Sequence, residues 1–257
     1  MSNARHNDSN RVALITGAGR RVGRAIALGL AQDGFAVGVH YNTSAQPAEE
    51  VATEIRDAGG QAVTLHHDLS HAESSGILID RLAEACGPVG ILINTASLFD
   101  EDRLSTLTAE SWRALIDVNL TAPVFLMQAF ANQPNVPDNA AIINFLDTQL
   151  TSAYPERFSY FVGKFGLEGA TRVAAFDLAA KGITVNAVAP GLILPSGQTE
   201  DEFVSRQRLT PLGVGLGTDH ILQAVRYLIS ARQTTGHTMV VDAGQRLMGF
   251  GNTPVGA

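Results

Sequence analysis

The sequence predicts a single α/β domain in which a seven-stranded parallel sheet carries helices on both faces. Short apolar runs rich in valine and isoleucine alternate along the chain with longer amphipathic stretches, and this alternation is typical of parallel sheets covered on both sides. A glycine-containing turn follows the first apolar run. These elements occupy nearly all of the 257 residues, which leaves no room for a second domain.

The apolar runs and amphipathic stretches give the expected elements in chain order. Strands are expected at residues 12–16, 36–41, 62–66, 91–94, 141–145, 184–188 and 239–242. Helices are expected at residues 21–32, 48–58, 72–86, 109–131, 160–180 and 219–230. The domain then covers residues 11–247, after a disordered segment 1–10 and before a tail 248–257. Loop 192–217 is long and polar and contains two prolines, so we expect a lid over the active site.

Composition and charge exclude several classes of partner. The net charge is −7 and no basic run is present, so nucleic acid and anionic membranes are poor partners. Cys86 is the only cysteine, which rules out a disulfide within the chain and fits a reducing compartment. The polar first ten residues lack the apolar stretch of a signal peptide, and no apolar run reaches the roughly 18 residues of a membrane span. We expect a cytoplasmic protein.

The turn after the first strand reads Thr-Gly-Ala-Gly-Arg-Arg-Val-Gly over residues 16–23. Glycines let the backbone approach a pyrophosphate, and the following helix N-terminus offers free N–H groups. Glycine is common in strand-to-helix turns, but the position after the first strand of a βαβ pattern favours a dinucleotide site. The expected cofactor contacts in this turn are Gly17, Arg20, Arg21, Val22 and Gly23.

The end of the second strand indicates which nicotinamide cofactor is bound. An NAD enzyme places an acidic residue there to hold the ribose 2′-hydroxyl. In this chain no acid occurs before Glu49, and Arg20 is available from the glycine turn. A guanidinium with nearby hydroxyls suits a 2′-phosphate, so NADPH is favoured, although Arg20 as a solvated surface charge is the alternative. The residues expected around this phosphate and its ribose are His40, Tyr41, Asn42, Thr43 and Ser44.

Tyr160 and Lys164 are the expected proton-transfer pair. Residues at positions i and i+4 share one face of a helix, so the phenol and the ammonium can point into one site. A nearby cation stabilises the phenolate and lowers a pKa that is about 10 in water. The chain has only two lysines, Lys164 and Lys181, so this spacing is unusual by chance. A surface Tyr–Lys pair is the alternative.

With these motifs in place, the chain resembles the short-chain dehydrogenase/reductase superfamily over roughly residues 11–247. The motifs in family order are the turn at 16–23, Asp68, Asn94-Thr95-Ala96-Ser97, Asn119, Tyr160 with Lys164, Pro190-Gly191, and Thr235-Gly236 before Asp242. The resemblance implies a Rossmann fold in which Asp68 meets the adenine and Lys164 holds the nicotinamide ribose. It also implies that Asn119 continues a proton relay from Lys164. Further cofactor contacts implied by the resemblance are Leu69, Asn94, Ala96, Ser97, Pro190, Gly191 and Ile193.

Three departures from the general family pattern resemble one branch, the pteridine reductases and bacterial dihydromonapterin reductases. Arg21 replaces the second glycine of the turn, Phe99 follows the fourth strand, and Asp147 replaces the serine 13 residues before Tyr160. This resemblance implies that a pterin stacks between Phe99 and the nicotinamide, and that Asp147 assists Tyr160 in protonation. It further implies substrate contacts at Arg21, Ser97 and Leu192. An ordinary loop aromatic at Phe99 and a turn cap at Asp147 are the alternatives.

One position also departs from that branch. Thr43 stands where some members carry a basic residue, so binding of the 2′-phosphate depends more on Arg20, His40 and Ser44. The pair His66-His67 does not indicate a metal site, because adjacent residues on a strand point to opposite faces.

The expected function is therefore NADPH-dependent reduction of a pterin of the dihydromonapterin, dihydrobiopterin or dihydrofolate type, with Tyr160 as proton donor. Lys164 and Asn119 would resupply the proton. A broad carbonyl or 3-oxoacyl reductase of the same family is the enzymatic alternative. A non-catalytic NADP(H)-binding sensor is the alternative of another class. By family analogy we expect a homotetramer built on helices 109–131 and 160–180.

Overall fold

The computed structural model describes residues 11–151, 155–195 and 199–248, and in these residues seven strands form one parallel sheet. The strand order is β3-β2-β1-β4-β5-β6-β7 and every neighbouring pair is parallel. The strands are β1 (Val12–Thr16), β2 (Ala36–Tyr41), β3 (Ala62–His66), β4 (Ile91–Asn94), β5 (Ala141–Phe145), β6 (Thr184–Pro190) and β7 (Thr238–Val241). The predicted fold class is confirmed. The chain reverses its direction of winding between β1 and β4, and ligands of such sheets bind at this switch point.

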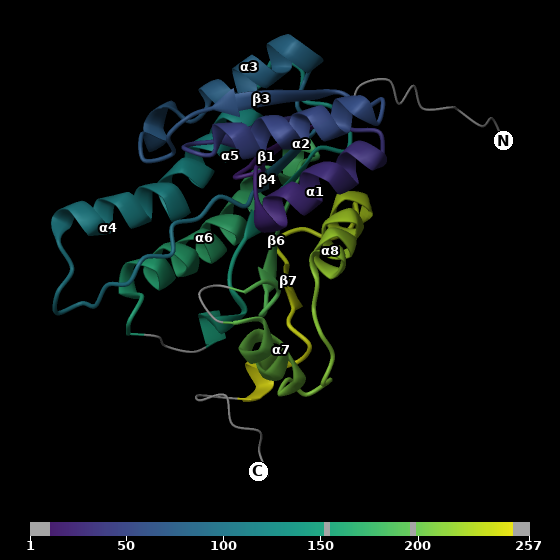
Figure 1. Ribbon diagram of the computed structural model, residues 1–257. Helices are drawn as coiled ribbons and strands as arrows, with labels where there is room; N and C mark the ends of the chain where they lie inside the picture. The colour runs from purple at the N-terminus through teal and green to yellow at the C-terminus, as the bar shows by residue number, and fades with distance from the viewer. Residues whose placement is uncertain (1–10, 152–154, 196–198, 249–257) are drawn as a thin grey trace.

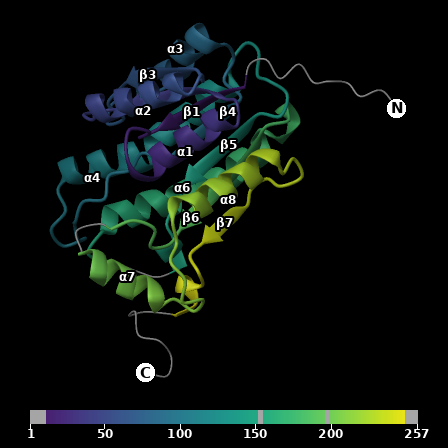
Figure 2. The ribbon, with the colours of Figure 1, turned by 45° about the vertical axis from the view of Figure 1, so that its right-hand side comes forward.

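Helices cover both faces of the sheet (Figures 1 and 2). The α-helices of the described residues are α1 (Arg21–Gln32), α2 (Ala45–Asp57), α3 (Ile77–Cys86), α4 (Ala109–Ile116), α5 (Ala122–Ala131), α6 (Phe158–Asp177), α7 (Glu200–Arg208) and α8 (Thr218–Ser230). Apolar side chains of α1, α2 and α8 form one core with the sheet, and those of α3, α5 and α6 form a second core on the opposite face. The near-continuous apolar strands are explained by this double burial.

The expected helix 109–131 is interrupted by a π-helical turn, Asp117–Thr121, between α4 and α5. Pro123 has no N–H to donate to the carbonyl of Asn119, so the regular ladder cannot continue there. The side chain of Asn119 instead donates to the carbonyl of Leu115 at 2.9 Å. The interruption places Asn119, an expected site residue, in an irregular turn of the kind often found at functional sites.

Among the described residues, the stretch Ala109–Ala131 is long and apolar enough to cross a membrane, with a mean hydropathy of 1.5. Half of it is buried inside the domain, where Leu126 and Phe130 are fully enclosed in the core beneath the sheet. Its apolar character is therefore explained by packing within the fold.

The segment 192–217 contains one element that the sequence analysis missed, helix α7. Thr199 caps it, accepting from the amide of Glu202 at 3.4 Å while its own amide donates to the Glu202 carboxylate at 2.9 Å. This capping box is readable in the sequence as Thr-x-x-Glu. The role of the segment as a lid stays a prediction.

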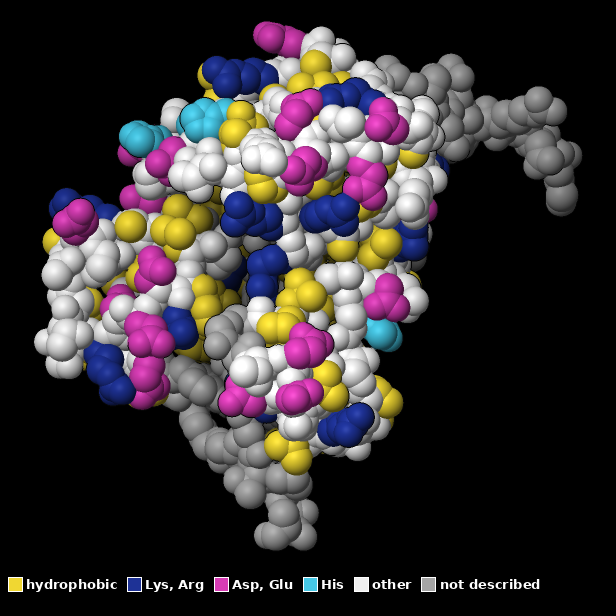
Figure 3. All heavy atoms as spheres, in the orientation of Figure 1, with side chains coloured by type: hydrophobic (Ala, Val, Ile, Leu, Met, Phe, Trp, Pro, Cys, Tyr) yellow, Lys and Arg dark blue, Asp and Glu magenta, His cyan; other side chains and the backbone are white. Residues whose placement is uncertain are grey.

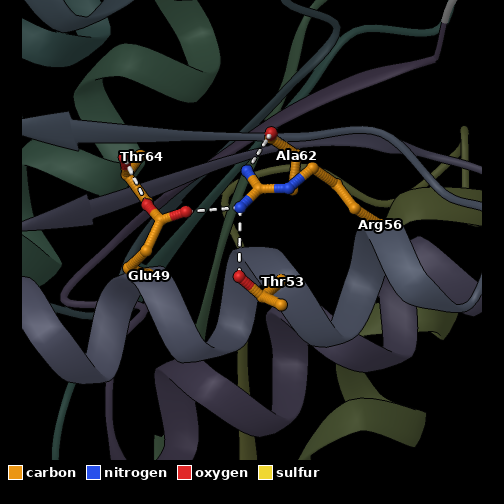
Figure 4. A network of polar contacts seen from close by, with 5 residues as sticks. All are labelled: Glu49, Thr53, Arg56, Ala62 and Thr64. Carbon is orange, nitrogen blue, oxygen red and sulfur yellow. Dashed lines mark hydrogen bonds and ion pairs between the residues drawn. The ribbon is translucent and has the colours of Figure 1, made fainter.

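Strand β3 is an edge of the sheet, and polar side chains of α2 reach across to it (Figure 4). Arg56 donates to the carbonyl of Ala62 at 3.3 Å and to Thr53 Oγ1 at 3.1 Å, and it also pairs with Glu49. The other carboxylate oxygen of Glu49 accepts from Thr64 Oγ1 at 3.2 Å. Exposed ion pairs contribute little stability, so the network mainly orients α2 against this edge.

Candidate active site

The turn after β1 folds back on itself so tightly that a side chain at Gly17 or Gly23 would collide with the backbone. A Cβ on Gly23 would lie 2.3 Å from the carbonyl oxygen of Gly17, and one on Gly17 would lie 3.1 Å from the Cα of Ala96. Gly17 also has a φ of +67°, which favours glycine. Arg20 is the N-cap residue of α1, and its side chain makes no capping hydrogen bond. The first amides of the helix are therefore left free to face the cleft. A backbone cradle at a helix N-terminus fits a pyrophosphate.

Arg21 occupies the left-handed region with a φ of +51°. This conformation is costly for a residue with a side chain, by roughly 1 kcal/mol, and explains why glycine is usual at this position. The guanidinium of Arg21 reaches across the cleft and donates to the carbonyl of Pro195 at 2.7 Å. The strained backbone therefore aims a cation over the space that follows the phosphate turn.

A cleft of about 1090 Å³ opens at the carboxyl ends of the central strands. The expected cofactor residues that line it are Gly17, Arg20, Arg21, Val22, Gly23, His40, Asn42, Asp68, Leu69, Ala96, Ser97, Lys164, Pro190, Gly191 and Ile193. The expected substrate residues Phe99, Asp147, Tyr160 and Leu192 also line it. The space-filling view shows several Lys and Arg side chains gathered near the middle of this face of the molecule (Figure 3).

Five expected site residues do not line the cleft. Tyr41 stacks against the ring of His66 at 5.3 Å between centroids, and Thr43 and Ser44 lie in the turn before α2. Asn94 is buried and donates to Asn144 Oδ1 at 2.8 Å. Asn119 is the fifth, in the π-helical turn. These positions support the walls of the cleft in the described structure, and their expected contacts with a cofactor stay predictions.

His40 is placed differently from the expectation that it binds the 2′-phosphate. Its Nδ1 accepts from the amide of Gly17 at 3.0 Å, and its Nε2 lies 3.0 Å from the carbonyl of His67, to which it donates. Burial lowers the pKa of His40 to about 4, which keeps the ring neutral. His40 therefore holds the phosphate turn in place and carries no charge toward a phosphate at neutral pH. Arg20, like its neighbour Arg21, is an exposed cation at this end of the cleft.

Asp147 and Tyr160 meet, as the resemblance implied. The phenol of Tyr160 donates to Asp147 Oδ2 at 2.9 Å, and the amide of Gln149 donates to Asp147 Oδ1 at 2.8 Å. The carboxyl group thus serves both as a turn cap and as the partner of the phenol. Burial raises the pKa of Asp147 above its usual range.

The expectation of a lowered pKa for Tyr160 is wrong in this structure. Burial, the charge of Asp147 and the hydrogen bond to it raise the pKa of Tyr160 well above 10, and Arg157 opposes them. Lys164 is buried and donates to the carbonyl of Phe145 at 2.8 Å, and its Nζ lies 5.7 Å from the centre of the Tyr160 ring. Burial lowers the pKa of Lys164 to about 8. The site holds a protonated phenol beside an ammonium with a readily released proton.

Asn119 and Ser97 form a second polar pair, of which Ser97 lines the cleft. Ser97 Oγ donates to Asn119 Oδ1 at 2.6 Å, and Asn119 Nδ2 donates to the carbonyls of Leu98 and Leu115, each at 2.9 Å. In the described residues no hydrogen bond joins Asn119 to Lys164. The expected relay between them stays a prediction. Ser97 is therefore held by Asn119, which fixes the loop that follows β4.

Phe99 forms the aromatic wall of the cleft. Its ring is 43% exposed and meets the Tyr160 ring edge-on, with centroids 4.6 Å apart and an angle of 81° between planes. The guanidinium carbon of Arg157 lies 3.8 Å from the centre of the Phe99 ring. A half-exposed ring beside the proton donor offers a stacking surface to a flat substrate.

Several residues that shape this site were not expected from the sequence. Thr16 Oγ1 accepts from the amides of Thr95 and Ala96, each at 3.0 Å, and so ties β1 to the loop after β4. Gln245 Oε1 accepts from the amide of Leu192 at 3.1 Å. A threonine at the end of β1 could have indicated this contact, because its hydroxyl lies at the switch point between β1 and β4. Arg157 and Gln245 had no signal, because their partners are distant in sequence.

Comparisons with known proteins agree with this geometry. A family model described as short chain dehydrogenase matches residues 11–203. A 3-oxoacyl-[acyl-carrier-protein] reductase FabG of Staphylococcus epidermidis is 33% identical over 243 residues, covering 91% of this chain and 98% of that protein.

Solved structures of two relatives have the same fold over nearly the whole chain. FolM alternative dihydrofolate reductase 1 from Brucella canis, complexed with NADP, matches with a TM-score of 0.88 and 33% identity, covering 97% of this chain and 98% of that one. The Brucella suis protein of the same name, also in complex with NADP, matches with a TM-score of 0.87 and 34% identity. The match covers 93% of this chain and 96% of that one.

Proposed function

Because the chain belongs to the short-chain dehydrogenase family, and is an oxidoreductase of that family, we propose that it reduces a pterin of the dihydromonapterin, dihydrobiopterin or dihydrofolate type with NADPH. The observation that carries this proposal is the hydrogen bond of 2.9 Å between the Tyr160 phenol and Asp147, beneath the ring of Phe99. A carboxyl group accepts hydrogen bonds from the several N–H groups of a pterin ring. A plain ketone offers no such donors.

The chain provides a site for NADP(H) at the switch point of the sheet. Gly17 and Gly23 shape the cradle for the pyrophosphate, and Arg20 offers a cation where no acidic residue would repel a 2′-phosphate. Lys164, which lines the cleft, would hold the nicotinamide ribose. When bound, the reduced cofactor supplies a hydride. The two FolM structures, which are NADP complexes, support this assignment.

The protein's own residues supply the proton. The phenol of Tyr160 gives its proton to a ring nitrogen of the substrate, and the ammonium of Lys164 stabilises the phenolate that forms. Asp147 accepts from the phenol before the reaction and orients the substrate. Because its pKa is raised, this carboxyl group also takes up a proton more readily than an exposed one. The raised pKa of Tyr160 keeps the phenol in the acid form that reduction requires.

A 3-oxoacyl reductase is the second candidate, and the FabG relative favours it because it aligns over 98% of its own length. The same Tyr160 and Lys164 would protonate a ketone oxygen. Against this candidate stands Asp147, whose carboxylate would lie close to the developing negative charge on that oxygen. The two candidate functions therefore predict opposite effects of the Asp147 carboxylate.

Replacing Asp147 with serine tests the proposal. We expect the wild-type protein to oxidise NADPH with 7,8-dihydrobiopterin or dihydrofolate, and D147S to lose about 10²-fold or more of that rate because orientation and proton supply both weaken. Its rate with acetoacetyl thioesters should stay equal or rise. NADPH consumption measured with each substrate gives the comparison, and exposed Asp138→Ser is the matched control. A wild-type protein that reduces oxoacyl thioesters well and leaves dihydropterins untouched would contradict the pterin assignment.

We further propose that the protein acts in the cytoplasm as a homotetramer in which α6 packs against the same helix of a second copy. Phe165, Val173 and Phe176 lie on one face of α6 and are 47%, 71% and 89% exposed. Apolar stripes of this kind are unusual on the surface of a monomer. A twofold axis brings one such stripe against its copy.

Phe176→Asp is expected to dissociate the assembly, because a carboxylate would be buried opposite its own copy. Light scattering after size-exclusion chromatography should show a smaller species for F176D and the wild-type mass for Val214→Asp, which changes an exposed apolar residue outside α6. If F176D keeps the wild-type mass, or the wild-type chain is monomeric, this interface is wrong.

A further inference from the structure

Helix α6, which carries the proton donor, begins without a cap of its own. Arg157 stands at the N-cap position and its side chain makes no capping bond. The cap comes from Asp102, 57 residues earlier, whose Oδ1 accepts from the amide of Ser159 at 3.0 Å. Its Oδ2 accepts from the buried hydroxyl of Ser159. A carboxylate at a helix N-terminus satisfies free amides and interacts favourably with the helix dipole.

The backbones on either side of this cap are also joined. The amide of Asp102 donates to the carbonyl of Glu156 at 3.0 Å, and the amide of Phe158 donates to the carbonyl of Asp102 at 3.2 Å. Arg103 and Glu156 form an ion pair at 2.6 Å. We call residues 99–103 and 156–159 the clasp. It connects the loop that bears Phe99 to the first turn of the helix that bears Tyr160.

Arg157 occupies the centre of the clasp. Its Nη1 donates to the carbonyl of Phe99, and its Nη2 lies 3.1 Å from Glu101 Oε1. The guanidinium covers one face of the Phe99 ring, with 3.8 Å from its carbon to the ring centre, and the rings of Phe99 and Tyr160 meet edge-on with centroids 4.6 Å apart. The side chain of Arg157 is 24% exposed, against 75% for Glu101, so most of the guanidinium is enclosed.

We propose that Arg157 is a positioning residue that determines preference for flat substrates, because it fixes the ring of Phe99 at a set angle beside Tyr160. The planar guanidinium stacks on the ring and holds the backbone of the same residue, so rotation and displacement of the ring are both restrained. A ring held in one orientation is preorganised for stacking, and preorganisation lowers the entropic cost of binding a flat molecule. A small aliphatic substrate gains nothing from it.

The charge of Arg157 gives an independent readout. Three charged groups lie around the Tyr160 phenol: Asp147 from the turn after β5, Lys164 on its own helix and Arg157 at the start of that helix. Arg157 lowers the pKa of Tyr160, against burial and Asp147, which raise it. Removing the charge should therefore move any activity loss caused by ionisation of Tyr160 to higher pH.

The test uses the full-length protein and the variants Arg157→Gln and Arg157→Lys, with Arg172→Gln as control. Arg172 lies on the same helix but is exposed and pairs only with Glu168 at 2.8 Å among the described residues. Kinetics with NADPH are measured for 7,8-dihydrobiopterin, for isatin as a second flat substrate, and for a short acetoacetyl thioester. Calorimetry with the NADP-loaded protein measures binding of biopterin and isatin without turnover.

We expect R157Q to raise KM and the dissociation constant for both flat rings by roughly 3- to 30-fold, the range of a partly buried cation–π contact, with kcat changed less than twofold. KM for the thioester should not change. R157K should recover the pH profile but not KM, because an ammonium cannot stack and hold the carbonyl of Phe99 together. Equal losses for flat and aliphatic substrates, or full recovery of KM by R157K, would overturn the proposal.

This inference rests on the proposed reductase activity but not on the pterin. A wild-type protein that binds isatin and not biopterin would overturn only the pterin assignment, and R157Q would still be judged on isatin. A wild-type protein that binds neither ring would overturn the role given to Arg157.

Discussion

Replacing Tyr160 with phenylalanine is expected to lower turnover by about 10²–10⁴-fold while the affinity for NADPH stays nearly unchanged. Only the hydroxyl is removed, and the ring keeps its edge-on contacts with Phe99 at 4.6 Å and Phe161 at 5.1 Å. The phosphate cradle lies on α1 and is not altered. Steady-state kinetics with 7,8-dihydrobiopterin and with an acetoacetyl thioester measures turnover, and fluorescence titration of NADPH measures affinity.

The exposed Tyr227 of α8 offers the matched control, because Tyr227→Phe removes a hydroxyl far from the sheet's switch point. A protein that only senses NADP(H) would show no turnover to lose, and Y160F would then behave as Y227F does. A loss of NADPH affinity as large as the loss of turnover would mean that the phenol holds the cofactor and does not supply the proton.

The position of Asp147 explains why the site favours an acid role for Tyr160. A phenol that donates to a buried carboxylate is held protonated, and the nearby negative charge makes the phenolate unfavourable. Alcohol oxidation would need the phenolate as base. Asp147 in place of serine therefore supports the proposed reduction near neutral pH.

Local sequence patterns were sufficient to predict the sheet, and the family resemblance indicated that Asp147 and Tyr160 would lie together. Strands such as 12–16 are continuous apolar runs, and burial on both faces leaves few other ways to pack them. Asp147 and Tyr160 meet because a turn at the end of β5 and the first turn of α6 converge at one edge of the sheet. The first conclusion depends on short-range periodicity, and the geometry of the second follows from the topology of a parallel sheet.

Contacts between distant residues could not be predicted in this way. Arg157 and Asp102 act on partners more than 50 residues away, and neither spacing nor composition indicates which loop meets which helix start. The pKa of Tyr160 was predicted in the wrong direction because the sequence shows the charge of Lys164 but not the burial of the phenol. The π-helical turn at Asn119 follows from Pro123, a signal that an amphipathic pattern conceals.

The burial of His40 could not be predicted from the sequence either. This burial is expected to lower the stability of the protein in mild acid. The pKa of His40 is about 4 in the folded protein and 6.5 in an unfolded chain. The folded pKa is the lower one, so the stabilising contribution of neutral His40 is complete above pH 6.5 and is lost as the pH falls toward 4. The unfolded state binds the proton first throughout that window. The loss amounts to about 2 kcal/mol at pH 5 and about 3 kcal/mol at pH 4.

His40→Asn separates this contribution from the titration of the carboxyl groups. An asparagine amide oxygen can accept from the Gly17 amide but does not titrate, so H40N should be less stable at pH 7.5 yet lose less stability on acidification than the wild type. Urea unfolding between pH 7.5 and 4.5 gives the slope of the unfolding free energy against pH for each protein. Exposed His237→Asn should have the same slope as the wild type. Parallel slopes for H40N and the wild type would show that His40 does not titrate abnormally. Because protonated His40 cannot accept from Gly17, NADPH affinity should weaken over the same pH range, which connects acid stability to the phosphate turn.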